Sequence, residues 1–279
     1  MKLLRAIASH PSGRIGGIII LIYLLLALAS AVGLVPHDPI AQDRINRLHA
    51  PDATYWLGTD LFGRDVLSRL TVGIRQSFIV AFFSVAIASI AGTLIGLLSA
   101  WWGGWWDATL MRLMDILLAF PAILLALLIV AVFGPGTVTS IIAIAIVYTP
   151  IFARVARGPA LSLKSREFVE AARTFGSSES YILTRHLLLN LVAPLTVQVT
   201  LALAWALLTE AALSFLGLGT QPPDPSLGLM LADSKNLMET APWLMIFPGL
   251  TVMFGILGFN LFGDALRDIV DPRSRTRQA

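Results

Sequence analysis

Three observations predict an all-α polytopic membrane protein with six transmembrane helices. Hydrophobic residues make up 56% of the 279 residues and charged residues only 13%, whereas soluble domains carry about a quarter charged residues. The chain contains long apolar runs of the length that crosses a bilayer core of about 30 Å. Basic residues gather on one side of the resulting topology. We expect a single transmembrane domain over residues 1–279 without a separate soluble module.

The composition also excludes several classes of function. The chain has no cysteine, so it can form neither a disulfide nor a thiolate metal site and has no catalytic cysteine. The formal charge of +3 does not indicate nucleic-acid binding, because the basic residues flank apolar runs and lack interleaved aromatic residues. These basic residues indicate membrane orientation.

The first span is expected at about 15–35. Lys2, Arg5 and Arg14 precede it, and small residues at 27–31 resemble a signal-peptide cleavage site. The run is nevertheless about 20 residues long, which favours a membrane-spanning helix over a signal peptide. We therefore expect a cytoplasmic amino terminus.

Residues 36–76 are polar and turn-rich, and we expect them to form an extracytoplasmic loop. Its core reads WLGTDLFGRDVLSRL, with helical spacing at Val66, Leu67 and Leu70. This spacing predicts an amphipathic helix on the membrane surface. Asp60 and Asp65 lack the alternating ligands of a calcium loop, so no metal site is expected there.

The remaining spans are expected at about 78–100, 113–133, 138–156, 191–216 and 242–262. Pro121 lies inside the third of the six spans, where a proline removes a backbone hydrogen bond and predicts a kink. Four tryptophans follow the second span in the manner of an interfacial aromatic belt. With six spans both termini lie on the cytoplasmic side, together with most of the 20 Lys and Arg residues.

The topology places a charged segment, residues 157–190, in the cytoplasm. Within it, Arg166–Phe175 predicts a helix, with its apolar face formed by Phe168, Ala171, Ala172 and Phe175. Gly176 suits a left-handed helix end, Ser177 or Ser178 can cap the next helix, and that second helix is expected at Tyr181–Asn190. Adjacent alanines beside a glutamate allow close approach of another protein, so this segment predicts a docking surface.

No residue pattern predicts catalysis. A P-loop requires a glycine-lysine step, and none of Lys2, Lys164 and Lys235 follows a glycine. Any ATP must therefore be hydrolysed by another protein. The four histidines are scattered without a metal-binding spacing, so the chain is not expected to be an enzyme or to hold a metal.

Glu210 is the ionisable residue deepest inside an expected span. A charge in the bilayer is costly and marks a functional site or a partnered contact. Two interpretations remain open: Glu210 lines a translocation path, which predicts that Glu210→Gln impairs uptake, or it makes a hydrogen-bonded helix contact. Asn260 is the second candidate for the path, with an interhelical hydrogen bond as its alternative.

The segment at 167–190 resembles the EAA signature of ABC-importer permeases. Glu170, Ala171, Ala172 and Gly176 match that signature, whereas Leu189 stands where the family usually has proline. Further stretches resemble permeases of the dipeptide, oligopeptide and nickel importer family, in particular the shorter, C-type permease of the pair. They are HDPIAQD, WLGTDLFGRDVLSRL, MDILLAFPAILLAL, EFVEAARTFG, LSFLGLGTQPPDPSLG and FNLFGDALRDIVDPR, and they cover nearly the full length.

The resemblance implies the type I ABC importer permease fold and a set of partners. These are a second homologous permease, two cytoplasmic ABC ATPases that bind ATP and Mg, an extracytoplasmic substrate-binding protein and membrane lipid. It implies no cofactor on this chain and a place in the cytoplasmic (inner) membrane of a bacterium or archaeon. The implied ATPase-coupling residues are Glu167, Glu170, Ala171, Ala172 and Gly176.

The expected contacts with the binding protein lie in two loops, Trp56–Arg69 and Gln221–Lys235. The candidate residues there are Asp60, Arg64, Gln221 and Asp224. On family grounds the expected substrate is a dipeptide or oligopeptide, with nickel chelates or opines as alternatives. An ATP-independent channel, a proton-coupled carrier and a passive scaffold remain open, and copurification with an ATPase would distinguish them from an importer.

Overall fold

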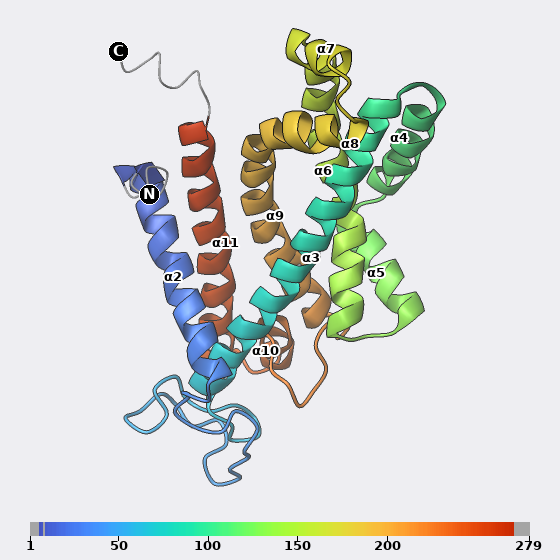
Figure 1. The fold of residues 1–279 in the computed structure, drawn as a ribbon. Helices are drawn as coiled ribbons and strands as arrows, with labels where there is room; N and C mark the ends of the chain where they lie inside the picture. Colours follow the sequence, from blue (N-terminus) through green and yellow to red (C-terminus); the bar gives the residue numbers. More distant parts are fainter. Residues whose placement is uncertain (1–5, 8, 271–279) are drawn as a thin grey trace.

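The fold is a bundle of long helices (Figure 1). A computed structural model describes residues 6, 7 and 9–270. Its elements are α2 (Pro11–Ala31), α3 (Val66–Trp102), α4 (Gly104–Ala119), α5 (Ala122–Phe133), α6 (Thr137–Lys164), α7 (Glu167–Thr174), α8 (Glu179–Tyr181), a π-helix η1 (Ile182–Leu188), α9 (Leu189–Phe215), α10 (Leu227–Ser234) and α11 (Trp243–Val270). Lys2, Arg5 and the basic residues of the 271–279 tail, on which the expected orientation partly rests, lie outside the described residues.

Five helices among the described residues are long and apolar enough to cross a membrane. They are α2, α3, α6, the continuous helical stretch Glu179–Phe215 and α11. The number rises to six if α4 and α5 together count as one span. The expectation of an all-helical membrane fold is confirmed, with five to six candidate spans.

The break between α4 and α5 occurs at Pro121. The two helices are bent by 93°, a much larger change of direction than the kink that the proline predicted. Phe120 is extended, with φ −86° and ψ 139°, as expected for a residue that precedes proline. In place of one helix with a kink at 113–133, the structure has two helices, because the chain leaves the helical conformation at Phe120 and Pro121 before α5 begins.

Helix α3 begins earlier than the expected second span. The carboxylate of Asp65 accepts hydrogen bonds from the backbone N–H and the hydroxyl of Ser68, at 2.9 and 2.6 Å, and so caps the first turn. From there α3 continues for 37 residues, about 55 Å at the helical rise. The expected amphipathic surface helix is wrong: residues 56–65 form turns, and Val66, Leu67 and Leu70 belong to the first turns of α3.

Glycines allow α3 and α6 to approach closely. A Cβ atom on Gly92 would collide with the carbonyl oxygen of Thr149, and one on Gly96 would collide with that of Ala153. The two glycines stand four residues apart, the small-xxx-small spacing that lets helix backbones pack together in membranes. Phe152 fills the space beside them and is fully buried. This packing joins α3 to α6 along the middle of the bundle.

Helices α2 and α11 lie side by side (Figure 1). A Cβ atom on Gly16 would lie 2.7 Å from the carbonyl oxygen of Gly258, so the small residues are again required for contact. His10, before α2, lies 3.5 Å from Asp268 near the end of α11. The start of α2 and the end of α11 are therefore neighbours, at the same end of the bundle as α7.

The helices after α7 form one continuous segment with a bend. In Figure 1 the gold segment from α8 runs across the bundle and then turns into α9. The π-helix η1 lies between α8 and α9, and π-helical turns are a known cause of helix distortion. Leu189 begins α9, and a proline, Pro194, lies further along inside that helix.

Candidate functional site

The candidate site is α7 together with the turn that follows it. Glu167 and Glu170 lie in the first turn of α7 and Arg173 in its last turn, an arrangement that complements the helix dipole. Gly176 has φ 76°, the left-handed conformation that glycine adopts without steric cost. Ser178 then accepts a hydrogen bond from the backbone N–H of Tyr181 at 3.3 Å. The helix, turn and second helix thus follow the sequence prediction, with Ser178 as the cap.

The buried face of α7 differs from the predicted one. Val169 is fully buried, and Ala172 packs half-buried against the same apolar cluster. Phe168 is 41% exposed, Phe175 is 88% exposed and Ala171 is also exposed. Most of the predicted apolar face therefore points away from the bundle and is uncovered.

The exposed surface of α7 combines carboxylates with apolar groups. Glu167 and Glu170 are exposed, as are the apolar residues Phe168, Ala171 and Phe175. Gly176 is exposed as well, and a Cβ atom there would meet nothing within 4 Å, so its role is conformational. Four of the expected coupling residues thus lie on the surface, whereas Ala172 faces the bundle.

A tryptophan that the sequence placed in the aromatic belt supports α7. Trp101 is only 5% exposed, whereas Trp102, Trp105 and Trp106 are more than half exposed. The guanidinium carbon of Arg173 lies 4.5 Å from the centre of the Trp101 ring, within the range of a cation–π contact. The helical position of Trp101 gave no signal for this role, because its partner lies on a distant helix.

Lys164, at the end of α6, also contacts the end of α3. Its ammonium group donates hydrogen bonds to the carbonyl oxygens of Ala100 and Trp101. Those carbonyls belong to the last turn of α3, where helices leave acceptors unsatisfied. The positive charge also complements the negative end of the α3 dipole. Through Lys164 and Arg173, the end of α3 is thereby connected to the ends of α6 and α7.

An ion pair connects α6 to α4 in the same region. Arg157 on α6 donates from Nε and Nη2 to the two carboxylate oxygens of Asp107 on α4, each at 2.6 Å. Ser99 on α3 donates to the same carboxylate. This bidentate geometry is the strong form of the arginine–carboxylate pair, and it connects three helices.

Glu210 lies inside the subunit and not on an open surface. It is 1% exposed, and its carboxylate accepts hydrogen bonds from Ser77 on α3 at 2.6 Å and from Ser214 on α9 at 2.8 Å. The hydrogen-bonded helix contact, one of the two interpretations of the sequence, describes this geometry. Asn260 is half-buried on α11 and makes no side-chain hydrogen bond to the described residues.

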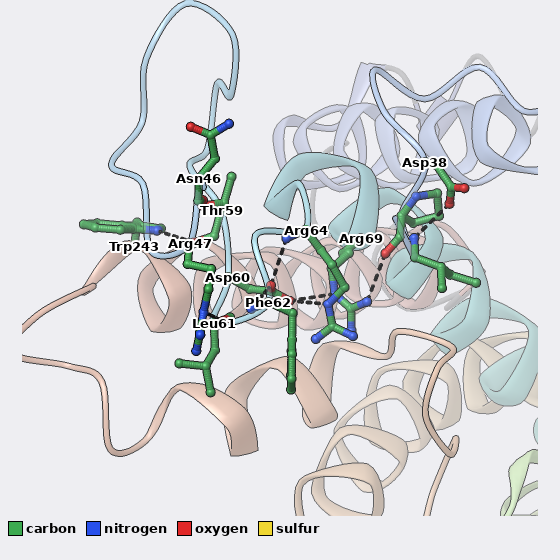
Figure 2. Close-up of polar contacts among 12 residues, drawn as sticks. Asp38, Asn46, Arg47, Thr59, Asp60, Leu61, Phe62, Arg64, Arg69 and Trp243 are labelled. Atoms are coloured by element: carbon green, nitrogen blue, oxygen red, sulfur yellow. Dashed lines mark hydrogen bonds and ion pairs between the residues drawn. The ribbon is translucent and has the colours of Figure 1, made fainter. Parts of the chain in front are cut away.

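At the end of the bundle opposite α7 (Figure 1), Asp60, Arg64 and Arg69 form a charged cluster that we call the arginine clasp. Figure 2 shows both arginine side chains turned toward Asp60. Nε of Arg64 donates to the Asp60 carboxylate at 2.6 Å, and Nε of Arg69 lies 3.5 Å from it. Backbone N–H groups of Phe62 and Arg64 also donate to Asp60, at 2.8 and 3.0 Å.

The clasp attaches the loop at residues 36–65 to α3. Arg69 is almost completely buried in the first turns of α3, and its Nη1 donates to the carbonyl of Pro39 at 3.0 Å. Trp243, at the start of α11, donates from its indole to the carbonyl of Thr59 at 3.3 Å. Two of the four expected binding-protein contacts, Asp60 and Arg64, are thus mainly buried.

The other two expected contacts, Gln221 and Asp224, are exposed in the loop between α9 and α10. Gln221 donates to the carbonyls of Gly217 and Gly219, each at 3.0 Å, so it orders its own loop. The Asp224 side chain makes no hydrogen bond or ion pair within the described residues. This loop leaves Asp224 available at the same end of the bundle as the arginine clasp.

Comparisons with known proteins agree with this architecture. Residues 92–276 match the family described as "Binding-protein-dependent transport system inner membrane component". The dipeptide transport system permease protein DppC of Alkalihalophilus pseudofirmus is 45% identical over 94% of this chain and 86% of its own. The probable D,D-dipeptide transport system permease protein DdpC of Escherichia coli K12 is 41% identical, covering 94% of this chain and 88% of its own.

Solved structures give a more distant likeness. A chain of the MetNI methionine ABC transporter, in an inward-facing conformation, has a TM-score of 0.61 at 18% identity. The match covers 73% of this chain and 96% of that one. At this identity the likeness concerns the fold alone.

Proposed function

Because this chain belongs to the family of binding-protein-dependent transport system inner membrane components, we propose that it forms half of the translocation path of a peptide importer. As a family member it is a multi-pass inner-membrane permease subunit of a bacterial ABC importer and not itself an enzyme. The family resemblance predicted from the sequence is confirmed. Membership also implies ATPase and binding-protein partners.

The exposed face of α7 carries the coupling part of this proposal. Glu167, Glu170 and Ala171 are exposed, beside the exposed ring of Phe175. On the opposite, buried side of α7, Val169 packs in the same apolar cluster as Trp101. A rigidly supported helix with an uncovered mixed surface is suited to transmit movement from a docked protein. We assign this face to the contact with an ABC ATPase, which would hold the ATP and Mg.

Orientation follows from this assignment. An ATPase is cytoplasmic, so α7, the start of α2 and the end of α11 would lie on the cytoplasmic side, and both termini would be cytoplasmic. The arginine clasp and the Gln221–Lys235 loop would then face the extracytoplasmic binding protein, with Asp224 as the exposed candidate contact. A second, homologous permease would complete the path as a heterodimer.

Short peptides are the proposed substrate. The support is the function of relatives that are 41–45% identical over almost the whole chain, among them dipeptide transport permeases. A nickel-chelate or opine importer is the remaining alternative within the family resemblance, and no feature of the described residues favours it.

The test is reconstitution of the chain with a homologous permease, the ATPase subunits and the binding protein in proteoliposomes. Uptake of labelled dipeptide is expected only when ATP is on the side of the membrane that carries the ATPase subunits and the binding protein is on the opposite side. Uptake that persists without ATP would overturn the importer proposal in favour of a channel or a proton-coupled carrier. ATP-dependent uptake of another solute, but of no peptide, would overturn the substrate.

A further inference from the structure

A cavity of about 160 Å³ lies beside the arginine clasp. Asp60 and Arg64 line it from the loop and Arg69 from α3. Asp233 and Leu237 line it from α10 and the turn after it. One water site needs about 10–15 Å³ of such space, so the cavity is large enough for several water molecules or a small organic group. The cavity therefore combines charged groups with space for a ligand.

The two arginines have more hydrogen-bond donors than acceptors. The Arg64 side chain is 9% exposed and that of Arg69 is 2% exposed. Within the described part of the chain, no acceptor is bonded to Nη1 or Nη2 of Arg64, or to Nη2 of Arg69. These unbonded nitrogens are not among the buried polar atoms that lack a partner within the described residues, so we infer that their N–H groups are open to the cavity that both residues line. A ligand with carboxylate oxygens would satisfy them in the bidentate geometry that arginine favours.

The charges that line the cavity indicate which net charge a ligand should have. Asp60 and Asp233 already offset the two arginine charges, so a bare anion would leave the site with net negative charge. Asp233 makes no side-chain hydrogen bond or close ion pair within the described residues. Burial raises the pKa of Asp233, against the lowering effect of Arg64 and Arg69. A cationic group beside Asp233 would stabilise its carboxylate.

We propose that this cavity binds a small zwitterion, with its carboxylate on Arg64 and Arg69 and its ammonium group at Asp233. The chemical class is that of free amino acids and short peptides. The biological role of this site rests on the proposed function: in a peptide importer, the site would hold a peptide on the extracytoplasmic side before the peptide enters the translocation path. It assigns to the cavity a ligand role that is separate from the structural role of Asp60.

Binding can be measured on the full chain in lipid nanodiscs by titration calorimetry. The probes are dialanine, its C-terminal amide, which lacks the carboxylate, and N-acetyl-dialanine, which lacks the ammonium group. We expect saturable binding of dialanine and at least tenfold weaker binding of each blocked peptide. Equal binding of dialanine and its amide, or no binding of dialanine, would overturn the proposal.

Variants locate the binding in the cavity. Leu237→Phe fills the space without changing a charge, and Arg64→Gln removes the donors, so each should weaken dialanine binding at least tenfold. Arg47→Gln is the matched control, because Arg47 lies in the same loop, donates to the carbonyl of Leu61 at 2.6 Å and does not line the cavity. If Leu237→Phe binds dialanine as tightly as the unaltered chain, the site is wrong even when Arg64→Gln fails to fold.

The uptake assay separates this inference from the proposed function. ATP-dependent peptide uptake without dialanine binding to the isolated chain would overturn only the cavity site. Dialanine binding in the cavity, in an assembly that transports no peptide, would support the site and overturn the peptide importer.

Discussion

Arg173 of α7 stacks over the buried ring of Trp101 at the end of α3, with 4.5 Å between the guanidinium carbon and the ring centre. Lys164 binds the carbonyl oxygens of the same turn. The exposed helix that we assign to ATPase docking is therefore joined directly to one of the longest helices of the bundle. Movement of α7 would be transmitted to α3 through this contact.

The first prediction concerns that contact. Trp101→Ala should lower the thermal stability of the purified chain and abolish ATP-dependent uptake, because α7 loses its support. Loss of a buried tryptophan costs about 3 kcal/mol or more. Trp102→Ala is the control: Trp102 is 51% exposed, so its removal should leave both measurements near their original values. Equal effects of the two variants would count against a special role for Trp101.

The second prediction distinguishes the two alanines of α7. Ala171 is exposed, so Ala171→Trp should fold normally, as judged by thermal unfolding, and lose copurification with the ATPase. Ala172 packs toward the bundle, so Ala172→Trp should instead lower stability by about 1–3 kcal/mol through overpacking. If Ala171→Trp retains the ATPase and full uptake, the exposed face of α7 is not the docking surface.

The third prediction revises the expectation for Glu210. An amide at this position can still accept from one serine and donate to the other, so Glu210→Gln should retain both contacts with Ser77 and Ser214. We expect stability and uptake close to those of the unaltered chain. Glu210→Leu should be destabilised, because it leaves two buried hydroxyl groups without their acceptor, at about 1–3 kcal/mol each.

Uptake measurements on the same pair test the path-lining interpretation. A Glu210→Gln protein that folds with normal stability but fails to transport would show that the charge is required. That result would restore Glu210 to the translocation path.

The fourth prediction concerns the arginine clasp. Asp60→Ala should lower the free energy of unfolding by about 3–5 kcal/mol, because removing one partner leaves buried guanidinium charges uncompensated. The loop at residues 36–65 should also become sensitive to limited proteolysis. Arg47→Gln serves as the exposed control in the same loop. Unchanged proteolysis of Asp60→Ala would mean that other contacts, such as the Trp243 hydrogen bond to Thr59, hold the loop.

Much of the local architecture could be predicted from residue order. The apolar runs predicted an all-helical membrane protein, and Pro121 predicted a disturbance in the third span. The left-handed Gly176 and a serine cap at Ser177 or Ser178 were also predicted, because each depends on backbone conformation and on contacts within a few residues. The sequence was less informative about helix lengths, since charged loops and helix ends share the same composition.

The sequence by itself determined the fold class, the family and the helix–turn–helix of the docking segment, because hydropathy, turn residues and motifs act over short distances. Only the tertiary structure decided which face of α7 is buried, since Val169 of α7 packs in one apolar cluster with Trp101 of α3, which is far away in the sequence. It likewise decided that Glu210 is paired with Ser77 inside the subunit and that Arg64 and Arg69 share one carboxylate beside a cavity. These features arise from contacts across the bundle, and no local periodicity specifies them.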